Sequence, residues 1–300
     1  MVVGQQGLFM FKGSIVALVT PMLSNGDVDF SQLEALINFH VREGTQALVI
    51  AGTTGESATL SPTEHCDLLQ KSYEIINRRL PMIAGTGANS TAEAIELTRC
   101  AESSRAEAAL LVTPYYNKPT QKGLVLHHQA IANAVDIPQI LYNVPGRTAC
   151  DMQADTVAEL AKVRNIVGIK EATGSIERLA DIKRQVDANF ALLTGDDSST
   201  CEFILSGGHG AISVTANVVP AKMANMCQLA LEGKAVEARA ADAEIAELHR
   251  LLFIESNPIP VKWAVSQMGF GELNLRLPMT VLDEKYQQPL KEALVASGAL

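Results

Sequence analysis

The sequence predicts an α/β protein, a (β/α)8 TIM barrel with a C-terminal helical appendage. Short apolar runs rich in β-branched residues recur with starts about 20 to 35 residues apart, the length of one βα unit. Helical patterns fill the intervals, and after about residue 220 the pattern is helical throughout. Continuous apolar strands that alternate with helices indicate a parallel sheet covered by helices, and eight such units indicate closure into a barrel.

The predicted elements follow one another along the chain. The strands cover residues 14–20, 46–51, 81–85, 108–113, 138–143, 165–170, 190–195 and 210–215. Between them, 31–43 and 91–103 have helical patterns, and N-cap candidates at Asn89 and Ser90 precede the second. Later helices are predicted at 221–232, 235–253, 260–268 and 284–296. A barrel needs only part of these last helices, so the remainder forms the appendage.

We expect three parts in the chain. These are an N-terminal extension over residues 1–10, the barrel over 11–233 and a C-terminal helical region over 234–300. The N-terminal residues lack the basic region of a signal peptide, and translation from Met10 is an open alternative. No G-x-G-x-x-G pattern follows the first strand, where the chain reads Val19-Thr20-Pro21-Met22, and this argues against a dinucleotide-binding fold.

The composition excludes several classes of function. A formal net charge of −9 and a pI near 5.2 argue against nucleic acid or an anionic membrane as partners. No apolar run approaches the roughly 20 residues of a membrane span. The five cysteines are scattered without C-x-x-C spacing, so we expect buried thiols in a reducing cytoplasm. The six histidines form no H-E-x-x-H cluster, so we expect no catalytic metal.

Lys170 is the most informative residue in the chain. It ends the sixth predicted strand, and chemistry in such barrels lies at the C-terminal ends of strands. Burial disfavours the ammonium form of a lysine, and the neutral amine is the nucleophile in Schiff-base chemistry on carbonyl substrates. The alternative is a structural lysine whose head reaches solvent. Glu171 should point to the opposite side of the strand, so we do not assign it as the base.

Other strand ends carry polar groups that suit a substrate with a carboxylate. Residues 52–57 read GTTGES, and their glycines, N–H groups and hydroxyls suit such a group. Tyr142 can relay protons beside a neutral lysine, and Arg147 can bind a carboxylate in bidentate fashion. Each feature has a structural alternative: a Gly/Thr turn, a packed aromatic ring, a solvated loop charge. Their coincidence at the ends of strands 2, 4, 5 and 6, with Tyr115 and Tyr116 after the fourth, favours one site.

These segments resemble the dihydrodipicolinate synthase family of the class I pyruvate aldolase superfamily, which includes N-acetylneuraminate lyase. The resemblance runs from about Phe11 to the C-terminus and includes GSIVALVTPM, GTTGESATL, PMIAGTGANSTAEAI, LLVTPYYNKPTQ, ILYNVPGRT, GIKEATG, GDD, GGHGAISVTAN and NPIPVKW. It implies condensation of pyruvate with L-aspartate 4-semialdehyde to 4-hydroxy-tetrahydrodipicolinate through a lysine Schiff base. That reaction is the first committed step of lysine and diaminopimelate biosynthesis. The resemblance implies no cofactor, because the protonated imine is itself the electron sink.

The resemblance implies the catalytic roles residue by residue. Lys170 would form the Schiff base with pyruvate. Tyr142 would transfer protons in a relay with Thr53 and Tyr116, and the neighbouring subunit would supply Tyr116. This implies at least a homodimer, and the family is commonly a dimer of dimers, which makes a homotetramer.

The same resemblance implies how the substrates are held. Thr54 and the main chain of Ile212 would contact the pyruvate moiety, and Gly195 would leave room beside it. Arg147 would hold the carboxylate of the second substrate. The nearest alternative is an N-acetylneuraminate lyase or 2-keto-3-deoxy-sugar aldolase with the same Schiff-base chemistry. Arg147 argues against it, because those branches usually lack arginine there. An inactive barrel that senses lysine or serves as a scaffold is the alternative from another class.

The resemblance further implies a feedback site for L-lysine at the dimer interface. The matching positions are Ser57, Ala58, Leu60, His65, Asn89, Glu93 and Tyr115. Glu93 suits an ammonium group, and the polar groups of Asn89 and Tyr115 suit a carboxylate. Pro62 departs from the pattern, since some lysine-sensitive members carry histidine there. Arg105 departs as well, because it stands at a turn where relatives usually have glycine and where a positive φ would strain it.

Overall fold

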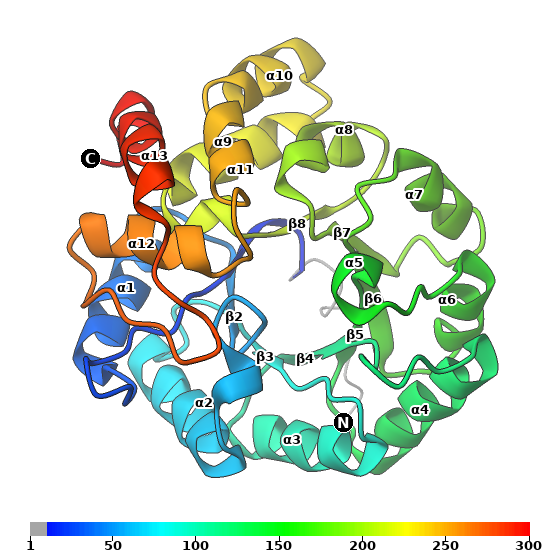
Figure 1. Cartoon of the computed structure of the whole chain (residues 1–300). Helices are drawn as coiled ribbons and strands as arrows, with labels where there is room; N and C mark the ends of the chain where they lie inside the picture. Colours follow the sequence, from blue (N-terminus) through cyan, green and yellow to red (C-terminus); the bar gives the residue numbers. More distant parts are fainter. Residues whose placement is uncertain (1–10) are drawn as a thin grey trace.

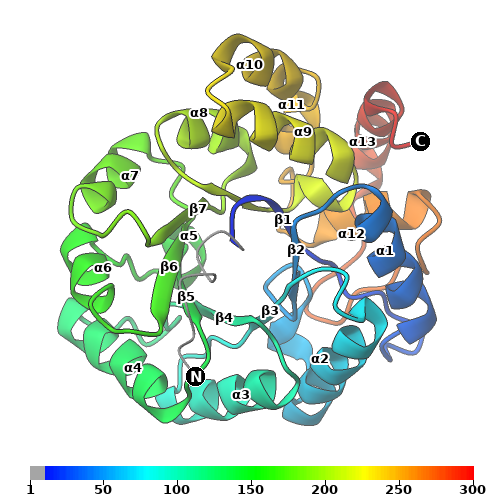
Figure 2. The ribbon, with the colours of Figure 1, turned by 180° about the vertical axis from the view of Figure 1, so that it is seen from behind.

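A closed barrel of eight parallel strands lies at the centre of the molecule, as the sequence predicts (Figure 1; Figure 2). The structure is a computed structural model that describes residues 11–300, so the expected extension over 1–10 lies outside the described residues. The strands are β1 (Gly13–Ala17), β2 (Ala47–Ile50), β3 (Met82–Gly85), β4 (Ala108–Val112), β5 (Gln139–Asn143), β6 (Ile166–Glu171), β7 (Ala191–Thr194) and β8 (Gly210–Ser213). Each pairs with the next, and β8 closes the barrel against β1.

Helices form a ring around this barrel (Figure 1). Those between strands are α1 (Phe30–Arg42), α2 (Pro62–Ile76), α3 (Thr91–Ser103), α4 (Gln121–Ala134), α5 (Pro145–Thr148), α6 (Ala154–Leu160), α7 (Ile176–Lys183) and α8 (Thr200–Leu205). After β8 come α9 (Pro220–Leu231), α10 (Ala235–Ala243), α11 (Ala246–Leu251), α12 (Ile259–Gln267) and α13 (Glu284–Ser297). Short 3-10 turns are η1 (Ser57–Thr59), η2 (Asp197–Ser199) and η3 (Thr215–Asn217). The helix predicted at 91–103 coincides with α3, and Ser90 caps it.

The strands are mostly apolar because both of their faces are buried. Ile15, Ile140 and Ile212 belong to the cluster that fills the barrel interior. Leu48 and Met82 belong to a second cluster, which packs between the strands and the surrounding helices. This burial on both sides explains the continuous apolar runs that the sequence shows.

Some strands end before the predicted position. The first ends at Ala17, three residues short of the predicted end at 20. Beyond it, the N–H of Val19 donates to Asn217 Oδ1 at 3.0 Å instead of continuing the ladder. Likewise, past the end of β8, the N–H of Thr215 donates to Asp197 Oδ2 at 2.9 Å. Side-chain acceptors therefore turn the chain out of the sheet where the apolar pattern still continues.

The helix predicted at 235–253 is two helices in the structure. The break falls at Ile245, which is fully buried and has a φ of −118°. It lets α10 pack on α9 while α11 packs on α13 (Figure 1).

The expected domain boundary between residues 233 and 234 stays a prediction. Within residues 11–300, no helix has the length and apolar character to cross a membrane.

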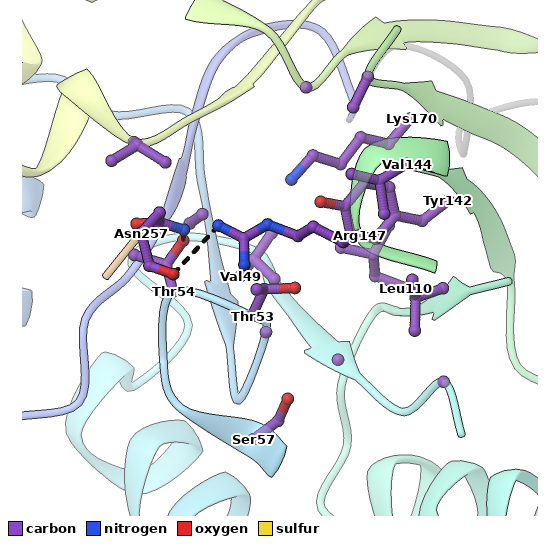
Figure 3. Close-up of a pocket in the computed structure, with 18 of the residues that line it drawn as sticks. Val49, Thr53, Thr54, Ser57, Leu110, Tyr142, Val144, Arg147, Lys170 and Asn257 are labelled. Atoms are coloured by element: carbon purple, nitrogen blue, oxygen red, sulfur yellow. Dashed lines mark hydrogen bonds between the residues drawn. The ribbon is translucent and has the colours of Figure 1, made fainter. Parts of the chain in front are cut away.

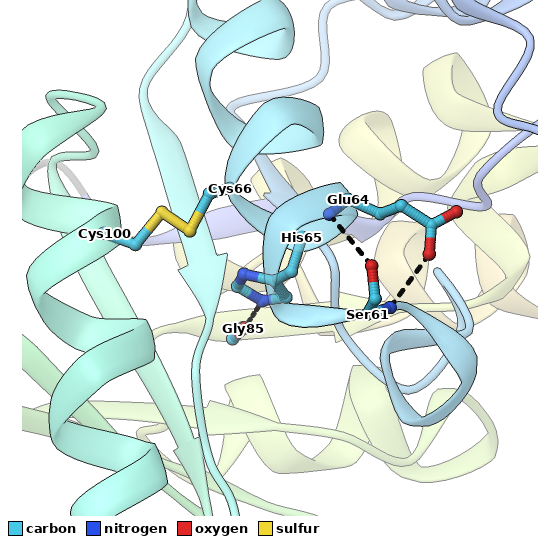
Figure 4. Close-up of a disulfide and its surroundings, with 6 residues drawn as sticks. All are labelled: Ser61, Glu64, His65, Cys66, Gly85 and Cys100. Carbon is cyan, nitrogen blue, oxygen red and sulfur yellow. Dashed lines mark hydrogen bonds between the residues drawn. A yellow bond between two sulfur atoms is a disulfide. The ribbon is translucent and has the colours of Figure 1, made fainter.

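The expectation of five thiols is wrong for two cysteines. Cys66 of α2 and Cys100 of α3 form a disulfide with their Cα atoms 5.8 Å apart (Figure 4). They are 34 residues apart in sequence, and neighbouring barrel helices bring them together in a way that no short spacing motif records. Cys150, Cys201 and Cys227 are free and buried.

Both departures from the family pattern have a structural account. Pro62 is the first residue of α2, where a missing N–H costs no helical hydrogen bond. Ser61 and Glu64 form a capping box around it (Figure 4). Arg105 has a φ of 61°, so the turn does need a left-handed residue. Its guanidinium lies near the Tyr73 hydroxyl, and Arg78 and Arg105 together lower the pKa of that tyrosine.

Candidate active site

A cavity of about 230 Å³ lies at the C-terminal ends of the barrel strands (Figure 3). The structure brings most of the predicted catalytic and substrate-binding residues to its wall. Those that line it are Thr53, Thr54, Tyr142, Arg147, Lys170 and Gly195. They come from the ends of β2, β5, β6 and β7, so the predicted ends of strands 2, 5 and 6 meet at one place, whereas Tyr115 and Tyr116 after β4 do not line this cavity.

Lys170 and Tyr142 face each other across neighbouring strands. They are direct partners in the β5–β6 register, and each is buried, with 6% and 7% of its surface exposed. The Lys170 amine lies 4.3 Å from the centre of the Tyr142 ring. It points into the cavity rather than along the molecular surface (Figure 3). The alternative of a solvated strand-end lysine is therefore wrong. Glu171 lies on the opposite side of the strand, as predicted, and lines neither cavity described here.

The loop after β2 forms a tight turn that presents main-chain N–H groups. The N–H groups of Gly55 and Ser57 both donate to the carbonyl of Gly52, at 3.0 and 3.2 Å. Within residues 11–300, the N–H groups of Thr53 and Thr54 make no hydrogen bond. These two donors at the cavity wall suit a small carboxylate.

Arg147 reaches across the cavity from the short helix α5. Its Nη2 donates to the main-chain oxygen of Asn257 at 3.1 Å (Figure 3). The Asn257 side chain in turn donates from Nδ2 to Thr54 Oγ1 at 3.0 Å. The guanidinium is thus anchored at one nitrogen while it keeps further donors for a carboxylate.

Asn257 is the main residue that sequence reasoning missed. It lines the cavity from the segment between α11 and α12, and its Oδ1 is buried without a partner among the described residues. The motif NPIPVKW contains it, but nothing local in that motif indicates that this segment returns to the barrel mouth. Phe253 and Asp196 also line the cavity and were not predicted.

Three predicted residues behave differently from the others. A Cβ on Gly195 would lie 2.6 Å from Lys170 Cε, so the glycine makes room for the lysine stem itself. Ile212 is buried in β8 and is not among the residues that line the cavity. Tyr116 has a φ of 72°, is 91% exposed and lies outside its own chain's cavity. Within residues 11–300, no hydrogen bond joins Tyr142 to Thr53, so the proton relay stays a prediction.

A second cavity of about 350 Å³ adjoins the first and shares Thr53, Gly85 and Arg147 with it. Most of the residues predicted for a lysine site line it: Ser57, Ala58, Leu60, His65, Glu93 and Tyr115. Asn89 does not line it, but its backbone hydrogen-bonds the Tyr115 side chain. The His65 ring nitrogen Nε2 bonds the carbonyl of Gly85 at 2.8 Å, and burial lowers the pKa of His65. Burial and the nearby Glu93 raise the pKa of Tyr115.

One group of described side chains has the donor types of a metal site. His65, Cys66 and Cys100 place three donor atoms within 4.8 Å of one another (Figure 4). The two sulfurs are bonded to each other, and thiolates are the form that binds metals. Among the described residues, the wall of the first cavity offers Asp196 as its one carboxylate and has no histidine or cysteine. That donor set does not resemble a metal site.

Comparison with known proteins agrees with this geometry. Residues 10–297 match the model of the "Dihydrodipicolinate synthetase family". A 4-hydroxy-tetrahydrodipicolinate synthase of Thioalkalivibrio sulfidiphilus is 57% identical over 96% of this chain and 98% of its own. The crystal structure of the chloride-inhibited dihydrodipicolinate synthase of Acinetobacter baumannii with pyruvate has a TM-score of 0.95 and 50% identity, over 96% of this chain and 99% of that one. The enzyme of Cyanidioschyzon merolae with lysine bound has a TM-score of 0.93 and 39% identity, over 97% and 99% of the two chains.

Proposed function

The chain belongs to the dihydrodipicolinate synthetase family, and we propose that it condenses pyruvate with L-aspartate 4-semialdehyde to 4-hydroxy-tetrahydrodipicolinate. The names of its relatives and the pyruvate in the Acinetobacter structure support this reaction. The observation that carries the proposal is the buried amine of Lys170, 4.3 Å from the Tyr142 ring and in one cavity with Arg147.

The first half of the reaction joins pyruvate to the protein. The amine of Lys170 attacks the keto carbon, and loss of water gives an imine that carries a proton on its nitrogen. The N–H groups of Thr53 and Thr54 would bind the pyruvate carboxylate, since both residues line the cavity. Removal of a methyl proton then gives an enamine, and the positively charged nitrogen accepts the electron pair. Tyr142 is the nearest hydroxyl-bearing side chain to Lys170 in the register and would move these protons.

The second half adds the semialdehyde. The enamine carbon attacks the aldehyde carbon and forms a carbon–carbon bond. The amino group of the semialdehyde then attacks the imine carbon and displaces Lys170, which closes the ring and restores the free amine. Pyruvate and semialdehyde thus give the cyclic product and one water. Arg147 would hold the carboxylate of the semialdehyde during both steps.

Among the alternatives, a sugar-acid aldolase is disfavoured. Arg147 lines the cavity and offers a cation that suits the carboxylate of the semialdehyde better than the hydroxyl groups of a polyol. The relatives at 57% identity also carry the synthase name.

Inhibition by L-lysine at the second cavity is part of the proposal. Glu93 and Tyr115 line that cavity, and it shares Arg147 with the active site. The lysine bound to the Cyanidioschyzon enzyme supports such a ligand. An amino acid there would bind its ammonium at Glu93 and would act on catalysis through the shared wall.

We also propose that a second subunit completes the site. Tyr116 is 91% exposed and sits outside its own chain's cavity, which suits a side chain donated to a neighbour in a dimer or a dimer of dimers. A cytoplasmic location completes the proposal, since both substrates are small metabolites. The Cys66–Cys100 disulfide is the one feature that fits an oxidising compartment better.

A coupled assay tests the reaction. Pyruvate and L-aspartate 4-semialdehyde are supplied with a reductase that consumes the product, and Lys170→Ala is compared with the exposed-residue control Lys162→Ala. Turnover should vanish only in Lys170→Ala. Borohydride should trap pyruvate on the wild type and on Lys162→Ala. A trapped adduct on Lys170→Ala would contradict the assignment of the nucleophile, and a wild type without turnover would contradict the reaction.

A further inference from the structure

A buried polar network lies behind the active site, on the outer side of β5 and β6. Asn143 and Glu171 directly follow Tyr142 and Lys170, so strand alternation sends their side chains away from the cavity. Asn143 is fully buried and Glu171 is 2% exposed. Neither lines the active-site cavity or the second cavity.

Asn143 and Glu171 bind each other and use nearly all of their hydrogen-bonding capacity. Asn143 Nδ2 donates to Glu171 Oε2 at 3.1 Å and to Asp151 Oδ1 at 2.9 Å. Its Oδ1 accepts from the N–H of Met152 at 2.9 Å. The other Glu171 oxygen, Oε1, accepts from the N–H of Thr173 at 2.8 Å. Every polar atom of the Asn143 amide and the Glu171 carboxylate therefore makes a hydrogen bond, and these bonds fix the orientation of both side chains.

Arg178 of α7 closes the network from outside. Its two terminal nitrogens donate to the two oxygens of Asp151, at 2.8 and 3.1 Å. One of them also donates to the Met152 carbonyl at 2.8 Å. The side chains of Arg178 and Asp151 are only 19% and 33% exposed, so this two-point contact is partly shielded from solvent. The network therefore runs without interruption from a surface helix to the strand pair.

This network lies at the end of the β5–β6 ladder that carries Tyr142 and Lys170. The register between the strands shifts between Gln139 and Ile140, on the side of the ladder away from the cavity. At the other end, Asn143 pairs with Glu171 one position beyond the pair of Tyr142 and Lys170. The hydrogen bond between the Asn143 and Glu171 side chains fixes the distance between β5 and β6 at this position. The distance between Tyr142 and Lys170, one position earlier, depends on it.

The main chain of Glu171 also holds the residue that packs on Lys170. Its carbonyl accepts from the N–H of Gly195 at 2.8 Å. Gly195 lies so close to the lysine stem that a Cβ would be 2.6 Å from Lys170 Cε. A shift of Glu171 would therefore move both the strand that carries Lys170 and the wall against which its stem rests.

We propose that Asn143 and Glu171 are positioning residues of the reaction. Their hydrogen bond, anchored by Arg178 through Asp151, holds the Lys170 amine and Tyr142 at the separation that imine formation and proton transfer require. The inference rests on the proposed function, because it assigns these two residues to that chemistry. Neither positioning residue touches the substrate. Removing the bond should leave the cavity and its carboxylate donors in place and slow the chemical steps.

The first test replaces Glu171 by glutamine, which keeps its shape. Asn143 and the Thr173 N–H donate to different Glu171 oxygens, and a glutamine has only one oxygen, so its NH2 group would face one of these two donors. We expect the kcat of condensation to fall about 10- to 100-fold, the scale of a misplacement near 1 Å. The KM for pyruvate should change less than about threefold, because the Thr53 and Thr54 donors are untouched. Glu177→Gln, an exposed residue of α7, is the matched control and should behave as wild type.

Arg178→Lys gives a graded second variant that keeps the charge and loses the two-point contact with Asp151. Its kcat should fall between those of wild type and Glu171→Gln. Thermal unfolding of each variant shows whether the fold is kept. A folded Glu171→Gln with wild-type kcat and a wild-type rate of borohydride trapping would overturn the positioning role. So would equal losses in kcat and pyruvate affinity, which a general loosening of the site would cause.

Borohydride trapping and turnover are measured separately. A failure of the proposed reaction can then be distinguished from a failure of the positioning role. A wild type that traps pyruvate but does not use the semialdehyde contradicts the proposed condensation and leaves the trapping comparison valid. A Glu171→Gln variant that traps pyruvate as fast as wild type contradicts the positioning role alone.

Discussion

The amine of Lys262 donates to the carboxylate of Glu56, which lies 206 residues earlier in the chain. Both side chains are buried, with 4% of Lys262 and 2% of Glu56 exposed. The second Glu56 oxygen accepts from the N–H of Arg276 at 3.0 Å. These contacts join the C-terminal helical region to the loop that presents Thr53 and Thr54. Burial lowers the pKa of Lys262, and the adjacent Glu56 opposes that shift.

Breaking this ion pair on one side should destabilise the protein more than removing both charges. Lys262→Met leaves a buried carboxylate with fewer donors, and we expect a loss of about 3 to 5 kcal/mol in unfolding free energy. Lys262→Met with Glu56→Gln should lose less than the sum of the two single variants. Urea denaturation of the four proteins measures the coupling. Additive losses would mean that the two side chains do not act as a pair.

Arg147→Lys should weaken use of the semialdehyde and spare imine formation. Lysine keeps the charge but loses the planar fork that binds a carboxylate at two points. We expect kcat/KM for the semialdehyde to fall about 10- to 100-fold, the scale of a charged hydrogen bond. Borohydride trapping at saturating pyruvate should match the wild type. The control is Arg164→Lys, whose side chain is 80% exposed. Equal losses in trapping and turnover would place Arg147 with pyruvate instead.

Glu93→Gln should reduce the sensitivity to L-lysine. Glu93 is the carboxylate of the second cavity placed to bind an ammonium group beside Tyr115. Losing its charge should raise the half-inhibitory lysine concentration about 10- to 100-fold. Inhibition curves at fixed substrate test this, with Glu96→Gln on the exposed side of α3 as the control. Turnover of the wild type that saturating lysine does not change would reject the lysine site altogether.

The Cys66–Cys100 disulfide can be tested by counting free thiols. A thiol reagent applied to the unfolded, unreduced protein should find three thiols, and five after reduction by a dithiol. Cys66→Ser should lower the unfolding free energy by about 3 to 4 kcal/mol, because the bond closes a loop of 34 residues. Cys66→Ser with Cys100→Ser should lose the same amount. Five thiols before reduction would show that the bond does not form in the isolated protein.

The burial of the His128 ring predicts how the unfolding free energy depends on pH. Both of its ring nitrogens are buried without a partner among the described residues, and burial, with nearby His127, lowers its pKa to about 3. Between that value and the usual 6.5, the unfolded chain binds a proton that the folded chain does not. Stability should therefore fall as the pH drops below 6.5. His128→Leu should reduce this slope by up to about 1.4 kcal/mol per pH unit. Unfolding free energies at pH 7, 6 and 5 measure it, and equal slopes would contradict a buried neutral ring.

Much of the active site was predictable because its residues follow local patterns. Lys170, Tyr142 and Arg147 stand at or just after strand ends, and parallel strands of a barrel end at one face. The turn at Thr53 and Thr54 was predictable for the same reason, from its glycines. Arg105 was singled out because relatives usually carry glycine at that turn, and the structure gives it the positive φ that such a glycine indicates.

The residues that were missed or misjudged are those with distant partners. Asn257 reaches Thr54 over 203 positions, and Cys66 finds Cys100 over 34. The network of Asn143, Glu171 and Arg178 is equally invisible as a pattern, since each residue alone has an ordinary structural explanation.

By itself the sequence determined the eight strands, the helices between them and the strand ends that carry chemistry. Helices and strands each repeat their side-chain directions over a few residues, so their apolar patterns can be recognised in short stretches of sequence. Only the tertiary structure decided that the C-terminal segment returns to the cavity, that two cysteines bond and that Glu171 belongs to a network with Asn143 that reaches Arg178. Such contacts depend on how the whole chain folds and packs. In a different fold the same side chains would have different neighbours.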